Sequence, residues 1–99
     1  MISLEGKKAL VTGGSRGIGR ATSLLLAKAG SDVAINFVRN EKRAAEVKKA
    51  IEDLGKKCLA IKADISREEE ARGLVEKVME AWGKIDVVIN NAGIWTYGE

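Results

Sequence analysis

The sequence predicts an α/β fold, in which helices cover both faces of an open parallel sheet. Three observations lead to this prediction. Short apolar, β-branched runs alternate along the 99-residue chain with longer segments whose apolar residues recur at helical spacing. The connections between these segments are short. A glycine-rich turn at residues 12–19 joins the first apolar run to the first helical segment.

The expected strands and helices follow from these patterns. Strands are expected at residues 7–12, 32–37, 58–61 and 85–90. The first helix is expected over residues 18–29, with Gly30 just past its end. Asn40 is the expected N-cap of the second helix, which Gly55 ends. The apolar positions of that helix are Ala44, Val47, Ile51 and Leu54.

The third helix is predicted from a capping signal and an apolar stripe. Ser66 and Glu69 match a capping box, with serine at the N-cap and glutamate at the third helical position. Gly83 is expected to close the helix. The residues expected to share its buried face are Ala71, Leu74, Val75, Val78 and Trp82.

The alternation β-α-β-α-β-α-β restricts the topology. Right-handed crossovers and the usual dinucleotide-binding arrangement predict a doubly wound, Rossmann-type parallel sheet with strand order 3-2-1-4. The first two helices are expected on one face and the third on the other. The sheet is expected to stop after its fourth strand, which leaves that strand as an open edge.

The glycine turn is the strongest functional signal. Gly13, Gly17 and Gly19 lack a Cβ, so the backbone can turn tightly and approach a ligand closely. Free amide groups at the start of the following helix favour an anion, and a pyrophosphate is the natural occupant. Gly14 and Gly30 can also be explained as residues that only shape turns.

The end of the second strand indicates which cofactor binds. Dinucleotide folds that prefer NAD hold the ribose hydroxyls with an acid about 20 residues past the glycines. Here that position reads Asn36-Phe37-Val38-Arg39, without a carboxylate. Arg39, and Arg16 in the turn, can each bind a 2′-phosphate by a charge-assisted hydrogen bond. The sequence therefore predicts NADP(H) rather than NAD(H), unless both arginines are ordinary surface cations.

Three motifs resemble those of the short-chain dehydrogenase/reductase family. Residues 12–19, TGGSRGIG, resemble its TGxxxGxG motif, and residues 90–93 resemble its NNAG motif. Asp64 follows the third expected strand, where that family places an aspartate beside the adenine. Residues 6–21 look closest to 3-oxoacyl-[acyl-carrier-protein] reductases, although sugar and other alcohol dehydrogenases of the family are similar here.

The resemblance assigns further positions to the cofactor. It implies that Asp64 accepts from the adenine amino group, with the Ile65 backbone adding a contact; a role at the helix start is the alternative. It also implies that Asn91 and Gly93 lie near the nicotinamide-side ribose and that Asn90 braces the sheet. The complete predicted site is Gly13, Gly14, Ser15, Arg16, Gly17, Ile18, Gly19, Asn36, Val38, Arg39, Asp64, Ile65, Asn91, Ala92 and Gly93.

The family's catalytic residues are not matched. Its serine, tyrosine and lysine lie beyond the region that this chain covers, and Tyr97 has no lysine four residues on. The sequence thus resembles the cofactor-binding half of a carbonyl reductase or alcohol dehydrogenase, and we expect no reductase activity from it alone. The resemblance implies a carbonyl or alcohol substrate, which an acyl carrier protein can present, and a homo-oligomer at full length. A non-catalytic nucleotide-binding module and a fragment that packs on a partner remain alternatives.

Composition excludes several other classes. The net charge of +3 comes from acids and bases that alternate along the expected helices, which does not indicate a nucleic-acid surface. The chain has no histidine, which excludes serine–histidine chemistry and histidine-bound zinc within it. A single cysteine, Cys58, excludes an internal disulfide and favours a cytoplasmic location. No apolar run is long enough to span a membrane, so no membrane partner is expected.

Overall fold

The computed structural model describes residues 3–15 and 17–91, which form strands and helices in strict alternation. The strands are β1 (Lys8–Thr12), β2 (Asp32–Phe37), β3 (Cys58–Lys62) and β4 (Val87–Asn90). The helices are α1 (Gly17–Lys28), α2 (Glu41–Asp53) and α3 (Glu68–Trp82). Every predicted element is therefore present, and its ends lie close to those expected.

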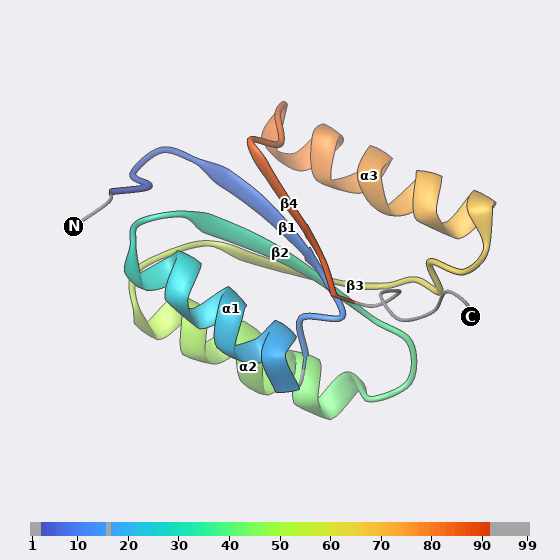
Figure 1. The fold of residues 1–99 in the computed structure, drawn as a ribbon, viewed down its shortest axis with the longest axis horizontal. Helices are drawn as coiled ribbons and strands as arrows, with labels where there is room; N and C mark the ends of the chain where they lie inside the picture. Colours follow the sequence, from blue (N-terminus) through green and yellow to red (C-terminus); the bar gives the residue numbers. More distant parts are fainter. Residues whose placement is uncertain (1–2, 16, 92–99) are drawn as a thin grey trace.

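The sheet is parallel, with strand order β3-β2-β1-β4, which confirms the predicted topology. Figure 1 shows α1 and α2 on one side of the sheet and α3 on the other, also as predicted. Leu10 at the centre of β1 is in register with Ala34 on β2 and with Val88 on β4. These three side chains therefore face the same side of the sheet, toward α3.

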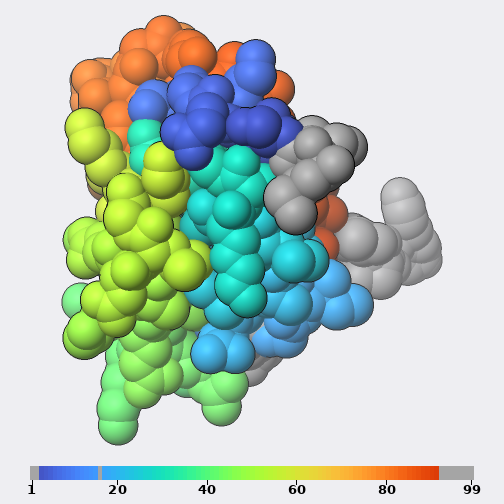
Figure 2. All heavy atoms as spheres, turned by 90° about the vertical axis from the view of Figure 1, so that its left-hand side faces the viewer, coloured from blue at the N-terminus to red at the C-terminus, as the bar shows by residue number. Residues whose placement is uncertain are grey.

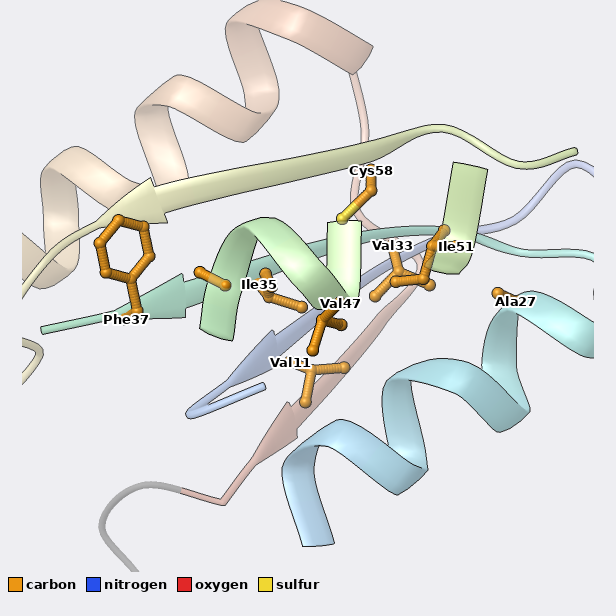
Figure 3. Close-up of a cluster of buried hydrophobic side chains, with 9 residues drawn as sticks. Val11, Ala27, Val33, Ile35, Phe37, Val47, Ile51 and Cys58 are labelled. Atoms are coloured by element: carbon orange, nitrogen blue, oxygen red, sulfur yellow. The ribbon is translucent and has the colours of Figure 1, made fainter. Parts of the chain in front are cut away.

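The larger core lies between the sheet and the α1–α2 layer. Figure 3 shows Val33 and Ile35 from the sheet facing Val47 and Ile51 of α2. All four are at most 1% exposed. Cys58 belongs to the same cluster and fills volume beside the sheet.

The α3 side is less completely covered. Leu74 and Val78 pack with Leu10 and Ala34, as the apolar stripe predicts. The prediction for Val75 is wrong: it is 43% exposed, and Val88 on β4 is 61% exposed. A single helix is too narrow to cover all four strands, so α3 buries the middle of the sheet and leaves the β4 side open. Leu54, expected in the α2 core, is also exposed, because it lies just past the end of that helix.

Charged groups tie the strands together at the end where they begin, which Figure 2 views face on. The Lys8 ammonium on β1 pairs with the Asp32 carboxylate on β2, and it lies 5.6 Å from the Trp82 ring centroid. The other Asp32 oxygen accepts from the Lys57 amide at 2.8 Å. The Lys8 amide donates to Asp86 beside β4, also at 2.8 Å. One cluster therefore connects the starts of all four strands.

The predicted capping box at α3 is wrong. The N-cap residue is Arg67, which makes no side-chain capping bond, and the helix begins at Glu68. Ser66 lies one residue before the N-cap, and its hydroxyl donates to Asp64 Oδ1 at 2.6 Å. Glu70 instead reaches back to accept from the Asp64 amide at 2.7 Å. The polar groups before α3 thus stabilise the loop after β3 and not the first turn of the helix.

Two other predicted helix ends are confirmed. Asn40 caps α2, its Oδ1 accepting from the Arg43 amide at 3.1 Å. Gly83 ends α3 in the left-handed conformation, and its amide donates to the Met79 carbonyl at 2.7 Å. Among the described residues, none of the helices combines the length and apolar character needed to cross a bilayer.

Candidate dinucleotide site

The carboxyl ends of the four strands bring the predicted site together. The glycine turn follows Thr12 at the end of β1, Asn36 lies near the end of β2, and Asp64 follows β3. Asn90 ends β4. Because all the strands are parallel, these positions share one edge of the sheet, where open α/β folds bind their ligands. β1 and β4 are neighbours there, at the point where the strand order reverses.

The glycine turn is built by close packing. A Cβ on Gly19 would overlap the carbonyl oxygen of Gly13, so α1 can start directly on the end of β1 only because residue 19 is glycine. Gly14 is required as well, since a Cβ there would lie 2.5 Å from Ile35 Cγ2. Gly13 and Gly17 have positive φ angles of 68° and 58°. Gly14 therefore does more than shape a turn, the alternative considered from the sequence, because its missing side chain makes room for Ile35 on β2.

The amino end of α1 opens onto a groove. Ser15 is 8% exposed, whereas Ile18 in the first turn of the helix is 77% exposed. The groove has a volume of about 540 Å³, within the range of small-molecule sites. Its lining comes from the amino ends of α1 and α2: Ser15, Gly17, Arg20, Asn40, Lys42, Arg43 and Glu46. Arg16 lies outside the described residues.

Three of the cations that line the groove were not among the site residues predicted from the sequence. Lys42 and Arg43 lie on α2, whose charges alternate in sign, and such a pattern is typical of solvated faces. Arg20 is a single cation in the first turn of α1. The three line one groove only because the first turns of α1 and α2 lie beside each other. Their position in the first turn of each predicted helix was the signal available in the sequence. Among the described residues, three cations and one acid, Glu46, therefore line this groove.

The end of β2 places its predicted site residues in different settings. Asn36 is 2% exposed, and its amide group is bonded to the backbone at both ends. The sequence predicted Asn36 among the residues that contact the cofactor. The structure instead places its side chain beneath the surface of the site. Val38 is 45% exposed, and Arg39 is exposed beside it. The surface at the end of β2 is thus apolar and basic, without a carboxylate at these positions.

Asp64 lies at the carboxyl end of β3 in a network of its own. Its Oδ1 accepts from both the hydroxyl and the amide of Ser66, at 2.6 and 3.0 Å. These two hydrogen bonds lower the pKa of the carboxyl, and the nearby charges of Arg67 and Arg39 lower it further. The local role at the start of α3 is therefore present. Because the Ser66 bonds use Oδ1, a ligand can be recognised through Oδ2 and through the neighbouring Ile65.

The β4 end joins the site through Thr12. The Thr12 hydroxyl lies 3.0 Å from Asn90 Oδ1, which agrees with the bracing role expected of Asn90. The Thr12 hydroxyl oxygen also accepts from the Asn91 amide, at 3.1 Å. The side-chain nitrogen of Asn91 is buried and has no hydrogen-bond partner among the described residues. The other predicted residues here, Ala92 and Gly93, lie outside the described residues, as do Trp95 and Tyr97.

Comparison with known proteins identifies the family. A family model described as short chain dehydrogenase matches residues 7–99. An uncharacterized oxidoreductase of Methylorubrum extorquens is 43% identical over 97 residues, which are 98% of this chain and 39% of the relative. An L-rhamnose 1-dehydrogenase (NAD(P)(+)) of Sphingomonas is 45% identical over 91 residues, 92% of this chain and 36% of the relative.

A solved structure agrees with these relatives. The crystal structure of a short chain dehydrogenase from Burkholderia cenocepacia in complex with NADP is 48% identical and superimposes with a TM-score of 0.89. The match covers 97% of this chain and 39% of that protein. This chain therefore spans less than half the length of the relatives it matches. With the family model, the sequence identity and the parallel sheet in agreement, the chain belongs to the short-chain dehydrogenase family of oxidoreductases.

Proposed function

We propose that this chain forms the NADP(H)-binding part of an oxidoreductase that interconverts a carbonyl compound and an alcohol. The observation that carries the proposal is the charge around the groove beside the glycine turn. Arg20, Lys42 and Arg43 line it against one acid, Glu46. A 2′-phosphate adds nearly two negative charges to a dinucleotide, so a basic rim favours NADP(H) over NAD(H).

The end of β2 supports the same preference. NAD-preferring folds place an acid there, and this acid would repel a 2′-phosphate. In this chain the exposed residues at that point are Val38 and Arg39. Arg39 also contributes to the lowered pKa of Asp64, after the larger effect of the Ser66 hydrogen bonds. Arg39 is thus near the residue proposed to contact the adenine, which is where a 2′-phosphate would need a cation.

The remaining residues fit the other parts of the cofactor. Ser15 and the amides at the start of α1 would bind the pyrophosphate, where the helix dipole favours negative charge. A Cβ on Gly17 would meet no heavy atom of the described residues within 4 Å, so the turn leaves room at this position. The buried Asn91 Nδ2, which has no hydrogen-bond partner among the described residues, would donate to the nicotinamide-side ribose. We propose Ala92 and Gly93 as further contacts on that side.

NADPH, when bound, would supply a hydride to a carbonyl carbon. The residues of this chain would hold and orient the dinucleotide, and no catalytic residue is assigned among them. A 3-oxoacyl group carried by an acyl carrier protein is our first candidate for the substrate, because residues 6–21 resemble reductases of that class. We further propose a cytoplasmic homo-oligomer for the full-length enzyme.

The cofactor proposal is tested by titrating the purified protein with NADPH and with NADH. We expect tighter binding of NADPH. Replacing Arg39 or Arg43 by alanine should weaken NADPH binding by about tenfold or more, since one charge-assisted hydrogen bond is worth about 1.5–3 kcal/mol. NADH binding should change little in these variants.

Arg72→Ala is the matched control, because Arg72 lies on α3 and pairs with Glu68 on the same helix. This variant should bind both cofactors as the unmodified protein does. NADH binding as tight as NADPH binding would refute the proposed cofactor preference. Equal losses for both cofactors in the Arg39 and Arg43 variants would remove the proposed role of these cations at the 2′-phosphate.

A further inference from the structure

We infer that Asn36 is a positioning residue that locks the phosphate-binding turn to the adenine side of the site. The inference rests on the proposed NADP(H) function for its consequence, but the bridge itself is a feature of the fold. Asn36 lies near the end of β2 and is 2% exposed, so it is out of reach of solvent. Its role must therefore be exerted through the groups it contacts.

The side chain makes one bond in each direction across the sheet. Its Oδ1 accepts from the Gly13 amide in the turn after β1, at 2.6 Å. Its Nδ2 donates to the Ala63 carbonyl, just past the end of β3, at 2.8 Å. One partner is a donor and the other an acceptor, and an amide presents both functions at the required spacing. An aliphatic residue offers neither, and an ionised carboxylate can only accept.

The two bonded backbone groups belong to the two halves of the proposed cofactor site. Gly13 is held on both sides, because its amide donates to Asn36 and its carbonyl packs against the first turn of α1 at Gly19. Ala63 directly precedes Asp64, the residue proposed to contact the adenine. Asn36 therefore sets the position of the phosphate-binding amides relative to the adenine contact. It also occupies the Gly13 amide, so the pyrophosphate must be bound by amides later in the turn.

Two substitutions separate positioning from general support of the core. Asn36→Ala leaves the Gly13 amide and the Ala63 carbonyl without partners at every pH. Asn36→Asp is conditional: when ionised, its carboxylate accepts from Gly13 but faces the Ala63 carbonyl without a proton. When protonated, the same carboxyl can accept from one group and donate to the other, as the amide does. Burial raises the pKa of such a carboxyl, so it should titrate in an accessible range.

The control is Ser31→Ala. Ser31 is also fully buried, and its hydroxyl bonds to backbone carbonyls, here those of Lys7 and Asp32. It lies at the opposite end of the strands from the glycine turn. This variant should lose stability without any change at the cofactor site, and it therefore measures what a merely structural loss does.

The first readout is amide hydrogen exchange at Gly13 in the protein without cofactor. Asn36→Ala should raise the Gly13 exchange rate about tenfold or more relative to unmodified protein, because one buried hydrogen bond is lost. Ser31→Ala should leave that rate unchanged relative to the other amides of β1. Unchanged Gly13 exchange in Asn36→Ala would overturn the bridge.

The second readout is the pH dependence of NADPH binding, expressed as the ratio of variant to unmodified Kd, since the cofactor phosphate itself titrates near pH 6. For Asn36→Asp we expect a loss of about tenfold near pH 8 that diminishes toward pH 5.5. The sequence has no histidine that would titrate in this range. A ratio that does not change with pH would overturn the positioning role, and this measurement remains decisive if Asn36→Ala does not fold.

The two proposals fail in different ways. If the unmodified protein does not bind NADPH, the proposed function is wrong, while Gly13 exchange still reports on the bridge. If the unmodified protein binds NADPH and both Asn36 variants bind it equally well at all pH values, the positioning role is wrong.

Discussion

The same substitution, glycine to alanine, should have opposite effects on α1 and α3. Gly19 and Gly73 both lie within helices. Alanine in place of a helical glycine stabilises a protein by about 0.5–1 kcal/mol when nothing obstructs the new methyl group, because glycine loses more backbone entropy on folding. A Cβ on Gly73 would meet no heavy atom within 4 Å in the part of the chain that the structure describes. Gly73→Ala should therefore raise the free energy of unfolding by about this amount.

Gly19→Ala should lower stability despite the same gain in helix propensity. Its Cβ would overlap the Gly13 carbonyl oxygen, which is backbone and cannot rotate away. α1 would have to move off the end of β1, and overpacking of this kind costs about 1–3 kcal/mol. Because the gain in helix propensity is the same, the two variants should differ by the cost of overpacking, about 1–3 kcal/mol, or on the order of 10 °C in Tm for a domain of this size.

Urea unfolding followed by circular dichroism, supported by thermal scans, measures both variants against the unmodified protein. The slopes of free energy against urea should remain equal, so that the midpoints report stability. A Gly19→Ala midpoint at or above that of the unmodified protein would refute the close seating of α1 on β1. A lower midpoint for Gly73→Ala would contradict the open surroundings described for that residue.

Three further predictions concern the rest of the fold. Asn40→Ala removes the α2 cap bond to the Arg43 amide and should cost about 1 kcal/mol in urea unfolding, with an unchanged midpoint counting against the cap. For Asp32, burial acts to raise the pKa, but the hydrogen bonds from Lys8 and the Lys57 amide outweigh it and hold the pKa below 3.8. The stability linked to this carboxylate is therefore present above that pH and is lost as the pH falls through the folded-state pKa. The loss of stability caused by Asp32→Asn should therefore become smaller in acid. A loss of stability that stays constant with pH would contradict this. Burial raises the pKa of the Cys58 thiol to about 12, so a thiol reagent near pH 8 should react only as fast as the chain unfolds, and rapid labelling of folded protein would show that the core is open.

Much of the fold could be predicted because the local signals agreed with one another. Asn40 and Gly83 end their helices as the sequence indicated, and β2 has the predicted bounds. The alternation of strands and helices, combined with the handedness of parallel crossovers, was enough for the strand order. Local patterns failed where a side chain could form more than one hydrogen bond and the structure used a different one from the bond predicted. Ser66 matched a helix cap by spacing, yet its hydroxyl bonds to Asp64.

The sequence predicted where the site lies, but not which contacts its residues make with one another. Residues of the glycine turn, Asp64 and Asn91 lie at the carboxyl edge of the sheet, as parallel strands require. The roles of Asn36 and Gly14 could not be derived, because each depends on what the adjacent strand presents to it. The cations of the groove were hidden for a similar reason, since Arg20 and Arg43 come together only when α1 and α2 lie side by side.

The sequence by itself determined the order of elements, the parallel sheet and the position of the glycine turn, because these depend on apolar periodicity, glycine placement and chain handedness. Only the tertiary structure decided which polar groups meet. Asn36 joins the turn after β1 to the end of β3, a link between residues that are 23 and 27 positions away along the chain. Hydrogen bonds over such separations form only after the strands have paired, so no local pattern encodes them.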